Sequence, residues 1–218
     1  MSVEQLYEGK ADTYFANARH DIVARLKTDA SSAVLELGCG AGGTGAAALA
    51  AGKAGRYAGI ELSPKAAAVA RERLTEVIEG NVEALDLTPL HGSFDALIIS
   101  EVLEHLTDPW RVLKALAACV RPSGQVFASS PNVAHWRVVR SLIAGRFDYE
   151  ESGVMDRTHL RWFTPASYRQ MFEAAGLQVV SIDPITPNAA RTRLLNRFTG
   201  NRFRHLFMTQ MMVEGRRP

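Results

Sequence analysis

The sequence predicts a single α/β domain in which helices cover both faces of a mostly parallel β-sheet. Short apolar runs typical of strands alternate with helical patterns along most of the 218 residues. Four glycines lie within the six residues Gly38–Gly43, directly after the first predicted strand, as in a strand-to-helix turn that lies against a ligand. Apolar residues make up 47% of the chain and charged residues 22%, ordinary values for a globular protein with one core.

The first half of the chain supplies four of the predicted strands. Residues 1–30 form a predicted N-terminal helical cap, and Ser63 followed by Pro64 predicts the start of a later helix, because serine caps the first turn and proline suits the first helical position. The elements predicted here are helix Val3–Lys27, strand Ala33–Leu37, helix Thr44–Ala51, strand Tyr57–Ile60, a helix from Pro64 to about Glu76, strand Val77–Glu79 and strand Phe94–Ser100.

The pattern changes after the fifth predicted strand. Residues 131–163 are rich in Trp, Arg, His and Asp and have no clear period, so we predict an insertion that forms a binding pocket within the single domain 1–218. The other elements predicted in this half are helix Trp110–Val120, a turn at Arg121–Gly124, strand Gln125–Ser130, a helix from Thr164 and Pro165 to Gly176, strand Leu177–Ile182, helix Leu194–Phe198 and strand Gln210–Glu214.

Composition excludes several classes of protein. No run approaches 18 apolar residues, and the N-terminus lacks the profile of a signal peptide. The two cysteines, Cys39 and Cys119, cannot form a disulfide framework or a four-cysteine zinc site, so a cytoplasmic location is predicted. A net charge of +2 does not indicate nucleic acid, and we interpret the seven arginines in residues 188–218 as an exposed helix face. Neither a membrane nor nucleic acid is an expected partner, and the oligomeric state is left open.

The glycine loop predicts an adenosine cofactor. Gly38, Gly40 and Gly43 fit the spacing G-x-G-x-x-G, and Glu61, at the end of the next strand, can accept hydrogen bonds from both ribose hydroxyls. These features fit a nicotinamide dinucleotide or another adenosine cofactor. Glu36, two residues before the first glycine, favours the second alternative, because a carboxylate there repels a pyrophosphate and attracts an aminium group.

At these residues the chain resembles the class I S-adenosylmethionine-dependent methyltransferases. The resemblance covers about Val34–Ser130 and implies a Rossmann-like three-layer sandwich, whose seven-stranded, mostly parallel sheet has an antiparallel last strand. It also implies S-adenosylmethionine as the cofactor. The matching segments, in order, are Glu36–Gly42 (ELGCGAG), Gly59–Pro64 (GIELSP), Phe94–Leu106 (FDALIISEVLEHL) and Val120–Gln125 (VRPSGQ).

The resemblance also implies which residues contact the cofactor. Glu36 would orient the aminium end, while Tyr14 and Arg19 lie where relatives close a helix over the methionine part. Asn81 stands where the family often has Asp, and its side-chain carbonyl can accept the same hydrogen bond from the adenine amine. The predicted cofactor-binding residues are Tyr14, Arg19, Glu36, Gly38, Gly40, Glu61, Leu62, Asn81, Val82 and Ser100.

Two carboxylates and two histidines predict a divalent metal site. Glu101, Glu104 and His105 have helical offsets that put them on one helix face. This E-x-x-E-H pattern, with His159 before an aromatic-Thr segment, resembles the small-RNA terminal 2′-O-methyltransferases, in which such residues hold Mg²⁺ against a vicinal diol. Mg²⁺ or Mn²⁺ bound here would lower the pKa of an acceptor oxygen. In the metal-free alternative, His159 is the general base and His135 a second candidate.

The acceptor side predicts O-methylation of a small hydroxylated molecule. Pro131–Val179 resembles the ubiquinone-biosynthesis O-methyltransferases and methyltransferases associated with polysaccharide synthesis. A sugar, a nucleotide-linked sugar or a quinol or phenol would therefore be the acceptor. The arginines of the insertion suit a phosphorylated acceptor or internal salt bridges equally; they are Arg137, Arg140, Arg146, Arg157 and Arg161.

Three alternatives stay open at this point. N-methylation needs a base less, although the N-P-P-Y type of motif is absent at Ser100 and Glu101. A nicotinamide oxidoreductase would need a pair such as Y-x-x-x-K, which the chain lacks. A non-catalytic module could use the same fold and the Arg-rich C-terminal segment to bind nucleic acid.

Overall fold

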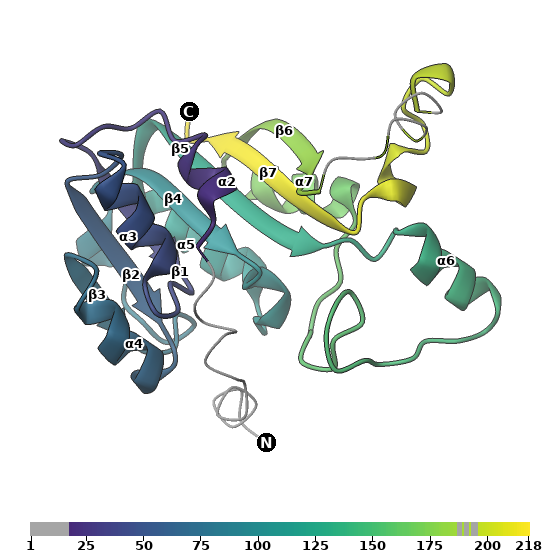
Figure 1. Cartoon of the computed structure of the whole chain (residues 1–218), viewed down its shortest axis with the longest axis horizontal. Helices are drawn as coiled ribbons and strands as arrows, with labels where there is room; N and C mark the ends of the chain where they lie inside the picture. Colours follow the sequence, from purple (N-terminus) through teal and green to yellow (C-terminus); the bar gives the residue numbers. More distant parts are fainter. Residues whose placement is uncertain (1–17, 187–188, 190–191, 193–195) are drawn as a thin grey trace.

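A seven-stranded sheet forms the centre of the computed structural model, which describes residues 18–186, 189, 192 and 196–218 (Figure 1). The strand order is β3-β2-β1-β4-β5-β7-β6. β1 to β5 are parallel, whereas β7 is antiparallel to both of its neighbours, so the predicted mostly parallel sheet with an antiparallel last strand is confirmed. The strands are β1 (Ala33–Leu37), β2 (Arg56–Glu61), β3 (Glu76–Glu79), β4 (Phe94–Ser100), β5 (Val120–Pro131), β6 (Gln178–Pro184) and β7 (Gln210–Arg216).

Helices cover both faces of this sheet and make the three predicted layers. Successive residues of β1 alternate between two cores, with Val34 in one and Leu35 in the other, because strand side chains point to opposite faces. One core includes residues of α2, α3 and α4, and the other includes residues of α5 and α7. The helices are α2 (His20–Val23), α3 (Gly43–Ala50), α4 (Pro64–Arg71), α5 (Pro109–Cys119), α6 (Trp136–Ile143) and α7 (Pro165–Ala174).

Local capping explains why two helices begin where the sequence predicts. The Ser63 hydroxyl accepts a hydrogen bond from the backbone N–H of Ala66, and Pro64 is the first residue of α4. At the start of α7, Thr164 and Ser167 exchange side-chain and backbone hydrogen bonds in a capping box. The predicted bounds of β1 and β4 are also confirmed.

Three predicted bounds are wrong. Of the predicted helix Val3–Lys27, the part that the structure describes is helical only over α2. The Gln125 side chain accepts a hydrogen bond from the backbone N–H of Lys27 and donates one to the backbone carbonyl of Arg25. These peptide groups are therefore not available for helical hydrogen bonds. α4 ends at Arg71, since the next residues lead into β3. The predicted turn at Arg121–Gly124 lies inside β5, whose register shifts there.

Of the predicted helix Leu194–Phe198, only 196–198 are described, and they are helical.

The insertion contains a helix that the sequence pattern does not predict. α6 follows β5 and extends away from the sheet, and the chain then returns through a long loop to α7 (Figure 1). Only Val138 of α6 is buried, so the helix lacks the broad apolar face by which a core helix is recognised. No helix among the described residues is both long and apolar enough to cross a membrane.

We predict that Gly38→Ala destabilises the protein more than Gly52→Ala. Both glycines have a positive φ, +73° and +65°, but a Cβ at Gly38 would lie 2.5 Å from Val102 Cγ2, whereas nothing lies within 4 Å at Gly52. Both variants place an alanine at a positive φ and share the cost of that backbone conformation. Urea denaturation should therefore show that Gly38→Ala lowers the free energy of unfolding by about 1 kcal/mol or more beyond Gly52→Ala. Equal losses would contradict the close approach of Val102.

Candidate active site

A cavity of about 480 Å³ opens at the carboxyl ends of β1, β2 and β4. This is where parallel α/β sheets place their ligands, at the point where the strand order reverses direction. Tyr14 lies outside the described residues. All the other predicted cofactor-binding residues line the cavity: Arg19, Glu36, Gly38, Gly40, Glu61, Leu62, Asn81, Val82 and Ser100.

The Glu61 carboxylate ties the glycine loop to the end of β2. Its two oxygens accept hydrogen bonds from the backbone N–H groups of Gly40 and Ser63, each at 2.8 Å. Gly38 and Gly40 both have a positive φ, a conformation that lets the backbone turn sharply along the cavity wall. Burial raises the pKa of Glu61, and hydrogen bonds from backbone N–H groups partly offset this rise.

Glu36 provides a buried carboxyl group on the cavity wall. Its side chain is 2% exposed and accepts a hydrogen bond of 2.9 Å from the Tyr57 hydroxyl. Burial raises its pKa to about 7. Arg19 lies at the same cavity and donates from Nη1 to the hydroxyls of Ser100 and Ser129, at 3.1 and 2.8 Å. An incoming cation would therefore meet a carboxyl group that is ready to ionise.

Comparisons with known proteins show which family the chain belongs to. A family model described as a methyltransferase domain matches residues 7–182. The ubiquinone biosynthesis O-methyltransferase of Thiobacillus denitrificans is 34% identical over 164 residues, which are 73% of this chain and 70% of the relative. The chain belongs to the S-adenosylmethionine-dependent methyltransferase family.

Solved structures share the fold of this methyltransferase. A chain from the complex between the Haloferax volcanii Trm112 methyltransferase activator and a methyltransferase has a TM-score of 0.67 and 20% identity, and the match covers 100% of this chain and 98% of that one. The Haemonchus contortus phosphoethanolamine N-methyltransferase 2, solved with S-adenosyl-L-methionine, has a TM-score of 0.71 and 13% identity over 100% of this chain and 60% of that one. At these identities the likeness concerns the fold alone.

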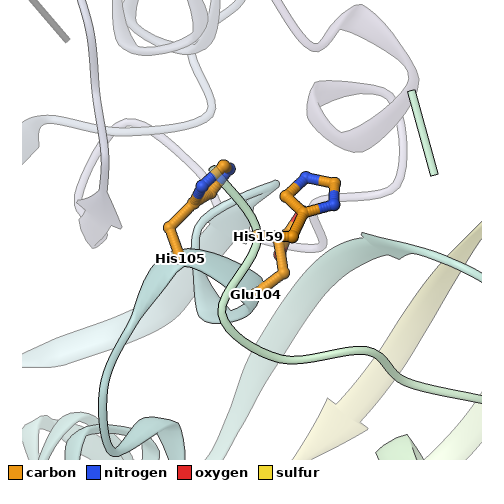
Figure 2. Close-up of side chains that lie close together, drawn as sticks. All are labelled: Glu104, His105 and His159. Carbon is orange, nitrogen blue, oxygen red and sulfur yellow. The ribbon is translucent and has the colours of Figure 1, made fainter. Parts of the chain in front are cut away.

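Glu104, His105 and His159 lie close together (Figure 2), and His105 also lines the cavity of this methyltransferase. One potential ligand atom from each lies within 4.8 Å of the others, and all three side chains are buried. Glu104 and His105 belong to the short 3-10 helix η3 (Leu103–His105), whereas His159 comes from the insertion. Backbone N–H groups of Leu160 and Arg161 both donate to the Glu104 carbonyl, at 2.8 and 3.0 Å, and hold the insertion against η3.

Backbone carbonyls orient both imidazole rings. His105 Nδ1 lies 3.2 Å from the Thr158 carbonyl oxygen, and His159 Nδ1 lies 3.2 Å from that of Val154. Because a carbonyl oxygen only accepts, each Nδ1 carries the proton, and in the neutral ring Nε2 then carries the lone pair. This arrangement is typical of metal-binding histidines and of histidines that act as bases.

The Glu104 carboxyl group is the most unusual member of this cluster. Its side chain is 1% exposed, and neither carboxylate oxygen has a well-formed hydrogen bond among the described residues, although the Ser130 hydroxyl lies nearby. Burial, and then the nearby Glu101, raise its pKa well above the ordinary value. A buried carboxyl without partners is costly unless a proton or a cation neutralises it. The donor set of one carboxylate and two imidazoles therefore fits a divalent cation.

Glu101 and His135 lie outside the cluster of Glu104, His105 and His159. The helical offsets predicted for Glu101 are wrong, because Glu101 has φ +54° and only Leu103–His105 form a helical turn. Its carboxylate lines the cofactor cavity and accepts from Gln210 Nε2 at 3.1 Å, so it does not join the group of three. His135 precedes α6 and lines a second cavity.

Thr44 and Gln210 are among the residues of the cavity wall that the sequence did not predict. Thr44 follows the glycine loop, and its hydroxyl accepts a hydrogen bond of 3.2 Å from the backbone N–H of Arg19. Its position directly after Gly43 is a sequence signal that indicates a place on the cavity wall. Gln210 reaches the cavity from β7, and nothing in its local sequence indicates this contact, because β7 enters the sheet beside β5.

We predict that Glu36 makes stability depend on pH. The pKa of Glu36 is about 7 in the folded protein, against an ordinary value of 4.5. The folded state therefore binds the proton more tightly than the unfolded state, and the free energy of unfolding falls as pH rises from 4.5 to 7. Relative to Glu36→Gln, the wild type should lose on the order of 3 kcal/mol across this window. Urea denaturation of both proteins measures the difference, and a constant difference would contradict the buried, protonated carboxyl.

Proposed function

We propose that this methyltransferase transfers the methyl group of S-adenosylmethionine to an oxygen atom of a small hydroxylated acceptor. The observation that carries the proposal is one cavity that joins the Glu36 and Glu61 carboxyl groups to the glycine loop, with His105 of the Glu104 cluster on the same wall. The names of the curated relatives support transfer to oxygen.

Each end of the cavity suits one part of the cofactor. Glu36 would pair with the aminium group, because loss of its proton leaves a buried carboxylate next to a cation. The Glu61 oxygens, already fixed by two backbone donors, would accept the ribose hydroxyls. Asn81 and Val82 would border the adenine; the Asn81 carbonyl also accepts from Glu83 N at 2.9 Å and is therefore held in place.

Glu104, His105 and His159 would hold a divalent ion such as Mg²⁺ or Mn²⁺ at the acceptor side. Such an ion lowers the pKa of an acceptor hydroxyl and so supplies the nucleophile at neutral pH. Glu101 would stand next to this set, on the cofactor side. Without an ion, His159 would serve as the general base through Nε2, since Nδ1 is held by Val154.

The family assignment removes two of the alternatives that the sequence left open, the nicotinamide oxidoreductase and the non-catalytic module. N-methylation of a small molecule stays the second candidate function, because an amine acceptor would fit the same cavity. A cluster that activates a hydroxyl favours oxygen. A small-molecule acceptor and a cytoplasmic location stay predictions.

Calorimetric titration with S-adenosylhomocysteine tests the cofactor assignment. The wild type should bind it, and Glu61→Gln should weaken binding about tenfold or more, because the amide cannot accept from both Gly40 and Ser63. Glu79→Gln is the matched control, since Glu79 ends the neighbouring strand and pairs with Arg71 on the surface. Binding of NAD⁺ in place of S-adenosylhomocysteine would refute the proposal.

Titration with Mn²⁺, followed by electron paramagnetic resonance, tests the metal site. Wild-type protein should bind Mn²⁺, and both Glu104→Gln and His159→Ala should lose this binding, because each removes one of three ligands. His91→Ala is the control, because His91 is exposed and precedes the amino end of β4, whereas Glu104 and His105 follow its carboxyl end. S-adenosylhomocysteine binding by the same variants shows that they fold. Equal Mn²⁺ binding by all four proteins, or none by the wild type, would leave His159 as the general base.

A further inference from the structure

The insertion encloses a second cavity of about 710 Å³. Residues of α6 form one wall, and the loop that follows α6 forms another. Three arginines and two carboxylates line this cavity, and His135 lines it as well. Burial, and then the charge of Arg137, lower the pKa of His135.

The arginines of the insertion differ in their partners. Arg146 and Arg157 form ion pairs with Asp148 and Glu151. Arg161 donates to the backbone carbonyls of Thr107 and Leu160. These three arginines are therefore engaged in internal contacts, one of the two alternatives that the sequence left open.

Arg137 and Arg140 have no carboxylate partner among the described residues. They are one turn apart on α6, and both guanidinium groups lie over the Trp136 ring, at 5.5 and 5.8 Å from its centre. Stacking on an aromatic face orients the planar guanidinium groups without neutralising their charge. Two oriented, unpaired guanidinium groups at a cavity are suited to bind an oxyanion.

Two connections show that this cavity adjoins the cofactor cavity. Thr209 lines the second cavity, and the next residue, Gln210, lines the first. Val154 also lines the second cavity, and its carbonyl oxygen orients the His159 ring. The centre of that ring lies 4.8 Å from the centre of the His105 ring, and His105 lines the first cavity. The Glu104, His105 and His159 cluster therefore lies between the two cavities.

From this placement we infer that the second cavity binds a phosphate or diphosphate group of the methyl acceptor through Arg137 and Arg140. The inference rests on the proposed function, because it assigns the acceptor to the side of the cluster opposite the cofactor. The acceptor is then a phosphorylated molecule whose hydroxyl reaches the cluster while its anionic group stays on α6. Two guanidinium groups one turn apart favour a diphosphate, since each can engage one of its phosphoryl groups.

Pyrophosphate titrated calorimetrically into the protein saturated with S-adenosylhomocysteine tests the inference. We expect binding to the wild type that falls about tenfold or more in Arg137→Gln/Arg140→Gln, because this variant lacks both guanidinium groups that would contact the anion. Arg157→Gln is the matched control, an arginine of the same insertion that is paired with Glu151, and it should bind pyrophosphate as the wild type does.

Two results would overturn the inference. One is that pyrophosphate binds neither protein, or binds the double variant and the wild type equally. The other is that malonate, a dicarboxylate, binds more tightly than pyrophosphate, which would assign the site to carboxylates. Failure of S-adenosylhomocysteine to bind in the first step would instead refute the proposed function, so the two failures are distinguishable. Both arginines are exposed, so the double variant is expected to fold.

Discussion

The position of β1 between β2 and β4 determines where the cofactor-binding side chains lie. All three strands are parallel, so their carboxyl ends meet at one edge, and the chain leaves β2 and β4 toward opposite sides of β1. Glu36 lies within β1, and Glu61 and Ser100 are the last residues of β2 and β4. The glycine loop then needs only to turn away from β1 without a side chain in the path of the ligand. The cavity is a consequence of this strand order, and the individual residues adapt it to an adenosine cofactor.

The cofactor half of the site was predictable because its signals are local. Strand bounds, the glycine run and the acid at the end of the second strand all lie within about thirty residues, and backbone geometry alone brings them together. The starts of α4 and α7 were likewise predictable, because each capping motif consists of a few adjacent residues. A contact between residues far apart in the sequence explains where the local pattern gave a wrong prediction. The Gln125 side chain forms hydrogen bonds with the peptide groups near Lys27, so the predicted helix does not extend to Lys27.

The acceptor half depends on contacts that sequence spacing does not reveal. Glu101 has the spacing of a helical residue, but its left-handed backbone directs the carboxylate to Gln210, more than a hundred residues later in the chain. The residues that meet at the cluster come from η3 and from a loop with no period. The likeness to the small-RNA methyltransferases, rather than sequence spacing, predicted that His159 joins Glu104 and His105, and the structure brings these three together. The sequence likewise could not separate the arginines that form ion pairs from the two that stack on Trp136.

Glu104 has two roles that constrain how this protein can change. Its backbone carbonyl receives the N–H groups of Leu160 and Arg161, while its carboxyl group faces His159 in the cluster. The contact that anchors the insertion and the proposed metal ligand therefore belong to one residue, and a change of length between His159 and Arg161 would shift the histidine away from Glu104. Length changes upstream, in the exposed residues 144–153, leave this anchor in place. Evolution of new acceptor specificities, or their design, is thus expected to proceed by remodelling that upstream stretch.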